Sequence, residues 1–133
     1  MTDEVLFEVE GEIARIRLNR PGSLHALTQA MCAAMIQRVA AWRGDPAVQA
    51  IAIDHAQGRG FCAGGDVRMA AESGRRDGVA ARDFFRTEYQ LNHLLFTTVK
   101  PTIAFMDGVT MGGGVGLALP CRYRIATERT ELA

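Results

Sequence analysis

Apolar and polar residues repeat with two different periods along the chain, and these periods predict its strands and helices. In residues 13–19 every second side chain is apolar and arginines stand between them, a period of two that is typical of a strand with one solvated face. A similar strand is predicted for residues 5–10, with a turn at Gly11 between the two. The chain therefore opens with a predicted hairpin that buries one face.

Two longer segments carry the helical period instead. The first helix is predicted to follow Thr28, which can cap it, and to end near Gly44, because Pro46 prevents its continuation. A second helix is predicted over residues 79–97. One apolar stripe runs along the first helix and consists of Met31, Met35, Val39 and Trp42.

Strands and helices alternate along the remainder of the chain. Further strands are predicted at residues 48–54, 102–106 and 122–127, with short helices after Asp66 and near Leu117. Such alternation requires crossover connections and so predicts a largely parallel sheet. Because no linker or repeat divides these elements, the sequence predicts a single α/β domain.

Length and charge exclude several classes of protein. The chain has 133 residues, the size of one domain, with 15 basic and 15 acidic side chains. A neutral chain lacks the field that attracts nucleic acids or anionic membranes. No apolar run approaches the ~20 residues of a membrane-spanning helix.

The cysteines and histidines do not form a metal-binding pattern. There are three of each, scattered and without CxxC spacing, so no zinc site is expected. The odd number of cysteines indicates reduced thiols, and Asp3 and Glu4 at the start argue against a signal peptide. A cytoplasmic location is therefore expected.

Two glycine-rich segments, residues 58–66 and 108–116, each follow an apolar strand. Ligands of α/β proteins bind beyond the carboxyl ends of the strands, where glycine allows close approach to the backbone. Two such turns side by side could aim two N–H groups at one oxygen and form an oxyanion hole. The alternative is that the glycines serve only tight turns and helix–sheet packing. Neither segment matches a P-loop or a dinucleotide-binding fingerprint.

Glu88 is the most informative single residue, because it interrupts an apolar stripe of the second helix. The stripe consists of Ala81, Phe84, Glu88, Leu91 and Leu95. Burial there would raise the pKa of the carboxyl group and suit it to hydrogen bonding or proton transfer. The alternative is a glutamate at the edge of the stripe that pairs with Arg82 or Arg86.

The segments Phe61-Cys-Ala-Gly-Gly-Asp66 and Asp107-Gly-Val-Thr-Met-Gly-Gly-Gly-Val-Gly116 resemble the two signature loops of the crotonase (enoyl-CoA hydratase/isomerase) superfamily. Asn19-Arg-Pro21, followed by Ala26 and Leu27, is similar to its first loop. The resemblance implies a spiral of β-β-α repeats. It also implies an acyl-CoA thioester as the ligand, with no metal or redox cofactor, since coenzyme A is part of the substrate.

The resemblance also assigns candidate site residues. It implies that the N–H groups of Ala63 and Gly113 form the oxyanion hole and that Glu88 contacts the substrate. The implied catalytic set is Ala63, Gly113 and Glu88, and the implied substrate-binding set is Ala63, Gly64, Gly65, Asp66, Glu88 and Gly113.

Residues 84–92, Lys100-Pro101 and residues 111–117 are similar to the subfamily of 3-hydroxyisobutyryl-CoA hydrolases. This similarity implies thioester hydrolysis and a role in valine catabolism. Enoyl-CoA hydratases typically carry a catalytic glutamate where this chain has Gly116. A hydratase or isomerase remains the alternative enzyme, and a non-catalytic acyl-CoA-binding or assembly module remains the alternative of another class.

The resemblance places a further acidic catalytic segment beyond Ala133. Residues 1–133 are therefore expected to be the N-terminal part of a single crotonase-like domain, incomplete at its C-terminal side. Alone they are expected to be essentially inactive. Exposed apolar surface on the last strand is expected to promote self-association.

Overall fold

The computed structural model describes residues 2–133, and its main feature is a five-stranded sheet in the order β1-β2-β3-β5-β7. The first two strands pair antiparallel as a hairpin, and all other neighbours are parallel. This arrangement confirms the predicted α/β class. The strands of the large sheet are β1 (Val5–Glu10), β2 (Ile13–Leu18), β3 (Ala50–His55), β5 (Thr102–Met106) and β7 (Tyr123–Ala126).

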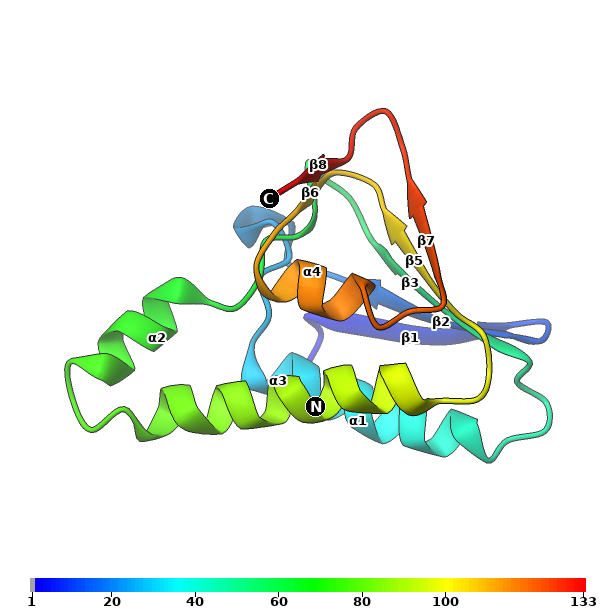
Figure 1. Cartoon of the computed structure of the whole chain (residues 1–133), viewed down its shortest axis with the longest axis horizontal. Coiled ribbons are helices and arrows are strands. Elements are labelled where there is room, and N and C mark those ends of the chain that lie inside the picture. The colour runs from blue at the N-terminus through cyan, green and yellow to red at the C-terminus, as the bar shows by residue number, and fades with distance from the viewer. Residues whose placement is uncertain (1) are drawn as a thin grey trace.

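A second, smaller parallel sheet has the order β4-β6-β8 and lies beyond the carboxyl ends of the large sheet (Figure 1). Each long parallel strand from β3 onward is followed by a short one, and a helix follows each of the first two pairs. This order is the β-β-α spiral that the resemblance implies. The short strands are β4 (Gly60–Cys62), β6 (Val109–Thr110) and β8 (Glu131–Leu132).

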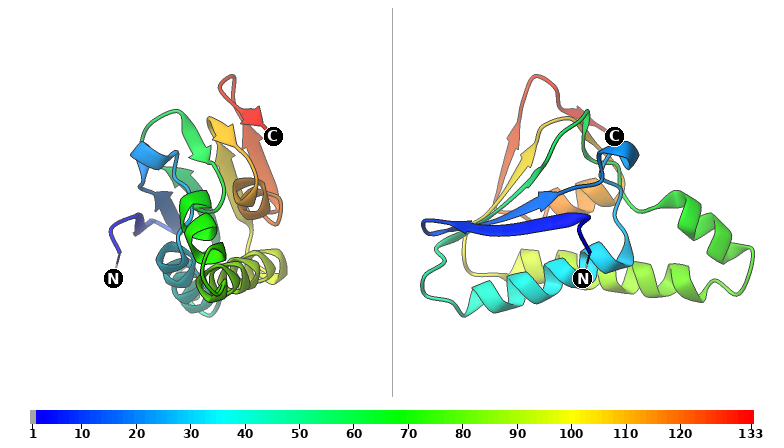
Figure 2. Two further views of the ribbon diagram at one scale, coloured as in Figure 1. Left: turned by 90° about the vertical axis from the view of Figure 1, so that its left-hand side faces the viewer. Right: turned by 180° about the vertical axis from the view of Figure 1, so that it is seen from behind.

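Helices cover one face of the large sheet. Figures 1 and 2 show α1 and α3 side by side below the sheet, α4 between the sheet and α3, and α2 projecting from the body. A short 3-10 turn, η1 (Pro21–Ser23), precedes them. The helices are α1 (Gln29–Arg43), α2 (Val67–Gly74), α3 (Val79–Thr97) and α4 (Gly113–Ala118).

The hydrophobic core lies between the large sheet and these helices. All four residues of the predicted α1 stripe are buried, and the Thr28 hydroxyl caps the helix by accepting a hydrogen bond from Met31 N at 3.1 Å. On the opposite face of the sheet, the arginines of β2 meet Asp54 of β3, with 2.6 Å between Arg15 Nη2 and Asp54 Oδ2. The alternation in β2 therefore separates a dry face from a charged one.

The end of the spiral exposes apolar side chains, as the sequence predicts. Tyr123 and Ile125 of β7 are 52% and 42% exposed, and Leu132 of β8 is 64% exposed. Self-association through these strands stays a prediction. Within residues 2–133, none of the helices combines the length and apolar character needed to cross a membrane.

Candidate active site

The two glycine-rich loops lie side by side, because β4 and β6 pair as parallel neighbours. Val109 N donates to Arg59 O at 2.9 Å, and Met111 N donates to Cys62 O at 3.1 Å. The predicted adjacency of the two loops is therefore confirmed, and both open beyond the same edge of the large sheet.

Gly114 makes the closest contact between these loops. A methyl group on Gly114 would overlap the carbonyl oxygen of Cys62. Glycine is therefore required here because the backbone of β4 passes directly over α4. The contact fixes the start of α4 against the first loop.

Replacing Gly114 with alanine is expected to lower the free energy of unfolding by roughly 1–3 kcal/mol, the usual cost of overpacking. Urea unfolding measures the change. Gly74→Ala is the matched control, since no atom lies within 4 Å of its added methyl group, and alanine there is expected to be neutral or stabilising by up to ~1 kcal/mol. Equal stability of the two variants would show that the loops can move apart.

A third segment, residues 20–27, closes against the first glycine loop and changes the prediction for Ala63. The Ala63 N–H donates to Leu24 O at 3.0 Å, and Asp66 N donates to Leu27 O at 3.0 Å. The Gly64 N–H contacts the Cys62 thiol. The Ala63 N–H therefore has a protein acceptor in this structure and is not free to bind a substrate oxygen.

The N–H groups of Gly65 and Gly113 differ from that of Ala63, because they have no such acceptor in the part of the chain that the structure describes. Within residues 2–133, neither donates a hydrogen bond to a protein acceptor, and Gly113 is the first residue of α4, where helical N–H groups lack intrahelical partners. A methyl carbon on Gly113 would lie 3.3 Å from Gly65 N, and one on Gly64 would lie 3.0 Å from Gly113 N. The loops thus bring two free donors together.

Glu88 lies beside these donors. It is only 4% exposed, and its Oε1 occupies the position where a side chain on Gly113 would begin. No cation pairs with it within residues 2–133, so the alternative pairing with Arg82 or Arg86 is not observed. Burial raises the pKa of the Glu88 carboxyl group, as the sequence predicts.

Asp66 has a structural role that the sequence did not indicate. Its Oδ1 accepts from Met69 N at 3.2 Å and caps α2. Its Oδ2 lies 3.4 Å from Arg20 Nη2. The Met69 N–H, with a smaller contribution from Arg20, lowers the pKa of the Asp66 carboxyl group. Its predicted contact with substrate stays a prediction.

His25 has no role in the sequence analysis, but in the structure it supports the first loop. Its backbone is left-handed, with φ +56°, and its side chain is buried. Arg20 N donates to its Nδ1 at 2.8 Å, so Nε2 carries the proton and donates to Gln57 O at 2.7 Å. His25 therefore joins residues 20–27 to the segment after β3.

Cys62 lies in the first glycine loop, and its side chain is buried. Burial raises the pKa of its thiol to about 12, so the thiolate is scarce at neutral pH. The part of the chain that the structure describes holds no group of three or more His, Cys, Asp or Glu side chains placed to bind a metal ion.

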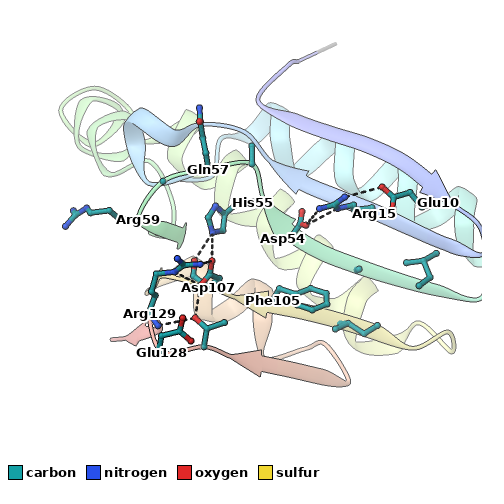
Figure 3. Close-up of a pocket in the computed structure, with 16 residues that line it drawn as sticks. Glu10, Arg15, Asp54, His55, Gln57, Arg59, Phe105, Asp107, Glu128 and Arg129 are labelled. Atoms are coloured by element: carbon teal, nitrogen blue, oxygen red, sulfur yellow. Dashed lines mark hydrogen bonds and ion pairs between the residues drawn. The ribbon is translucent and has the colours of Figure 1, made fainter.

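A cavity of about 1030 Å³ lies on the charged face of the sheet (Figure 3). Glu88, Gly65 and Gly113 are not among the residues that line it. Its main charges are already paired, as with Arg15 and Asp54, or Arg129 and Asp107 at 2.7 Å. The free N–H groups of Gly65 and Gly113, beside the buried Glu88, suit a carbonyl oxygen. The glycine loops therefore define the candidate active site, and this cavity does not. These loops have the chemistry that a site for the carbonyl oxygen of an acyl group requires.

Comparison with known proteins identifies the family of the chain. The chain belongs to the enoyl-CoA hydratase/isomerase family, whose sequence profile matches residues 13–133. A solved structure, a carnitinyl-CoA dehydratase from Mycobacterium thermoresistibile, superposes with a TM-score of 0.97 at 41% identity, over 99% of this chain and 39% of that one.

Two curated relatives are informative. The mitochondrial 3-hydroxyisobutyryl-CoA hydrolase of Gallus gallus is 42% identical over 130 residues, which are 98% of this chain and 34% of that protein. The small ribosomal subunit protein mS47 of Neurospora crassa is 40% identical over 98% of this chain and 26% of that protein. The chain thus spans about a third of the length of the hydrolase and about a quarter of the length of mS47.

These names contradict the expected cytoplasmic location. The matching hydrolase is described as mitochondrial, and another relative is a ribosomal protein. The expectation was wrong because reduced cysteines exclude oxidising compartments without distinguishing one reducing compartment from another.

Proposed function

We propose that the chain forms the acyl-CoA-binding part of a thioester hydrolase of the 3-hydroxyisobutyryl-CoA hydrolase type. The observation that carries this proposal is the pair of free N–H groups, Gly65 and Gly113, next to the buried Glu88. The names of the hydrolase relatives support the same reaction.

The two N–H groups hold the thioester oxygen, which gains negative charge when water attacks the carbonyl carbon. Each such donor is worth ~10²–10³ in rate. The C–S bond then breaks, so that one water molecule yields a carboxylic acid and the free thiol of coenzyme A. Glu88 positions the acyl group at the donors, and Gly64, Gly65 and Asp66 lie along the path of the coenzyme A moiety.

Hydration of a double bond is the alternative reaction, and Gly116 bears on it. A hydratase needs a carboxylate to move a proton to or from the water, and Gly116 offers no side chain where the resemblance places that glutamate. Among residues 2–133, Glu88 is the buried carboxylate that lies against Gly113.

We call the longer protein, of which this chain is expected to be the N-terminal part, the gene-encoded protein. It is expected to release coenzyme A from 3-hydroxyisobutyryl-CoA. A thiol reagent follows that release, and the absorbance of the enoyl double bond in crotonyl-CoA follows hydration. Hydration of crotonyl-CoA without release of coenzyme A would refute the hydrolase proposal.

A non-catalytic module is the second candidate, and the specific observation in its favour is the similarity to mS47, named as a small ribosomal subunit protein. Under this alternative the gene product binds acyl-CoA or an assembly partner, and no thioester is turned over. Co-sedimentation with small ribosomal subunits, in the absence of CoA release, would support it.

A further inference from the structure

Asn92 carries an amide oxygen that receives no hydrogen bond from residues 2–133. It lies one helical turn after Glu88 on α3, so the two side chains share a face of the helix. Its Oδ1 is fully buried and has no hydrogen-bond partner within residues 2–133. A buried acceptor without a donor is costly, so a donor from outside these residues would stabilise it.

The amide of Asn92 reaches across to α4. A methyl carbon on Gly116 would lie 3.1 Å from Asn92 Nδ2. Glu88 contacts Gly113 as Asn92 contacts Gly116, about one turn earlier on both helices. The missing side chain of Gly116 therefore leaves room for the amide of Asn92 between α3 and α4.

This pairing places Asn92 at a defined distance from the oxyanion donors. An α-helix rises about 1.5 Å per residue, so the amide opposite Gly116 lies roughly 4.5 Å from Gly113 along α4. A short acyl chain whose carbonyl oxygen lies at Gly65 and Gly113 extends over this distance.

We propose that Asn92 determines specificity by binding a hydroxyl group on the acyl chain, which makes short hydroxyacyl thioesters the preferred substrates. A hydroxyl both donates and accepts a hydrogen bond, as does the amide, so the two groups satisfy each other. The inference rests on the proposed function, because it assumes that the thioester oxygen lies at the N–H groups of Gly65 and Gly113. It adds a residue and a substrate feature that the oxyanion donors do not supply.

The test compares two ligands that differ only in the hydroxyl, 3-hydroxyisobutyryl-CoA and isobutyryl-CoA, with the gene-encoded protein and its Asn92→Leu variant. The loss of a neutral hydrogen bond is expected to lower kcat/KM for the hydroxylated thioester roughly 3- to 10-fold. The value for isobutyryl-CoA is expected to stay within about twofold. Gln90→Leu, an exposed amide on the same helix, is the control and is expected to change neither value.

Gly116→Ala provides a second variant that keeps the asparagine at position 92. Its methyl group, 3.1 Å from Nδ2, displaces the amide and is expected to reduce the preference for the hydroxylated thioester partially. An equal loss for both thioesters in Asn92→Leu, or no loss for either, would overturn the proposal.

Binding of the two thioesters, measured by calorimetry, separates this proposal from the proposed function. If no coenzyme A is released but Asn92→Leu removes a preference in binding for the hydroxylated ligand, the hydrolase fails and the role of Asn92 stands. If coenzyme A is released and the preference is unchanged in Asn92→Leu, the hydrolase stands and the role of Asn92 fails.

Discussion

The 133-residue chain, expressed by itself, is expected to release coenzyme A from 3-hydroxyisobutyryl-CoA at no more than the background rate. Its two N–H groups can stabilise an oxyanion, but they cannot activate water. A positioned general base contributes ~10²–10⁴ in rate. Among residues 2–133, Glu88 is the buried carboxylate beside the donor pair, and we assign it to substrate binding. The measurement is CoA release by the isolated chain, compared with buffer alone.

Extension of the chain by the segment that follows the matching region in the hydrolase relatives, or addition of that segment in trans, is expected to restore activity. Restoration in trans is the positive control, because it shows that the isolated chain was folded and able to bind substrate. Robust CoA release by the 133-residue chain, abolished in Glu88→Ala, would identify Glu88 as the catalytic base instead.

Replacement of Glu88 by glutamine in the gene-encoded protein is expected to lower kcat/KM for hydrolysis by roughly 10- to 100-fold. A hydrogen bond to a charged group is worth about that much, and glutamine keeps the shape of the side chain while it removes the charge. Glu72→Gln, at an exposed position on α2, is the matched control and is expected to leave the rate unchanged.

The same variant is expected to gain stability relative to the wild type as the pH rises above the ordinary pKa of glutamate. Burial raises the pKa of Glu88, so the folded state holds its proton more tightly than the unfolded state. The free energy of unfolding of the wild type therefore falls as the pH rises from the ordinary pKa of glutamate through the raised one. Glutamine does not ionise and escapes this loss. Urea unfolding from pH 4 to pH 8 measures the difference, and a wild type that gains stability relative to Glu88→Gln as the pH rises would indicate a cationic partner for Glu88.

Much of the fold could be predicted because its main helices and strands are long enough for the hydrophobic period to be recognised. The stripe of α1 repeats over four buried residues, and Glu88 stands out because it interrupts another such stripe. The glycine loops were expected to meet because both follow parallel strands of one sheet. By contrast, β4, β6 and β8 have only two or three residues. This length is too short for an alternation to show, so the sequence pattern predicts no strand at these positions.

The identity of the free N–H groups could not be predicted from the sequence. Ala63 and Gly65 stand two positions apart in the same loop, and what distinguishes them is the hydrogen bond from Ala63 N to Leu24 O. That bond depends on how residues 20–27 fold back, with left-handed backbone at Leu24 and His25. Neither residue type signals such a conformation, since glycine is the usual choice there.

A crystal structure of the gene-encoded protein with a bound, slowly hydrolysed acyl-CoA thioester tests the central claim most directly. The thioester oxygen is expected to lie about 2.7–3.1 Å from both Gly65 N and Gly113 N, the range for oxyanion donors, with the acyl chain next to Glu88. A thioester oxygen bound by the Ala63 N–H, or bound in the cavity on the charged face of the sheet, would contradict the proposed site.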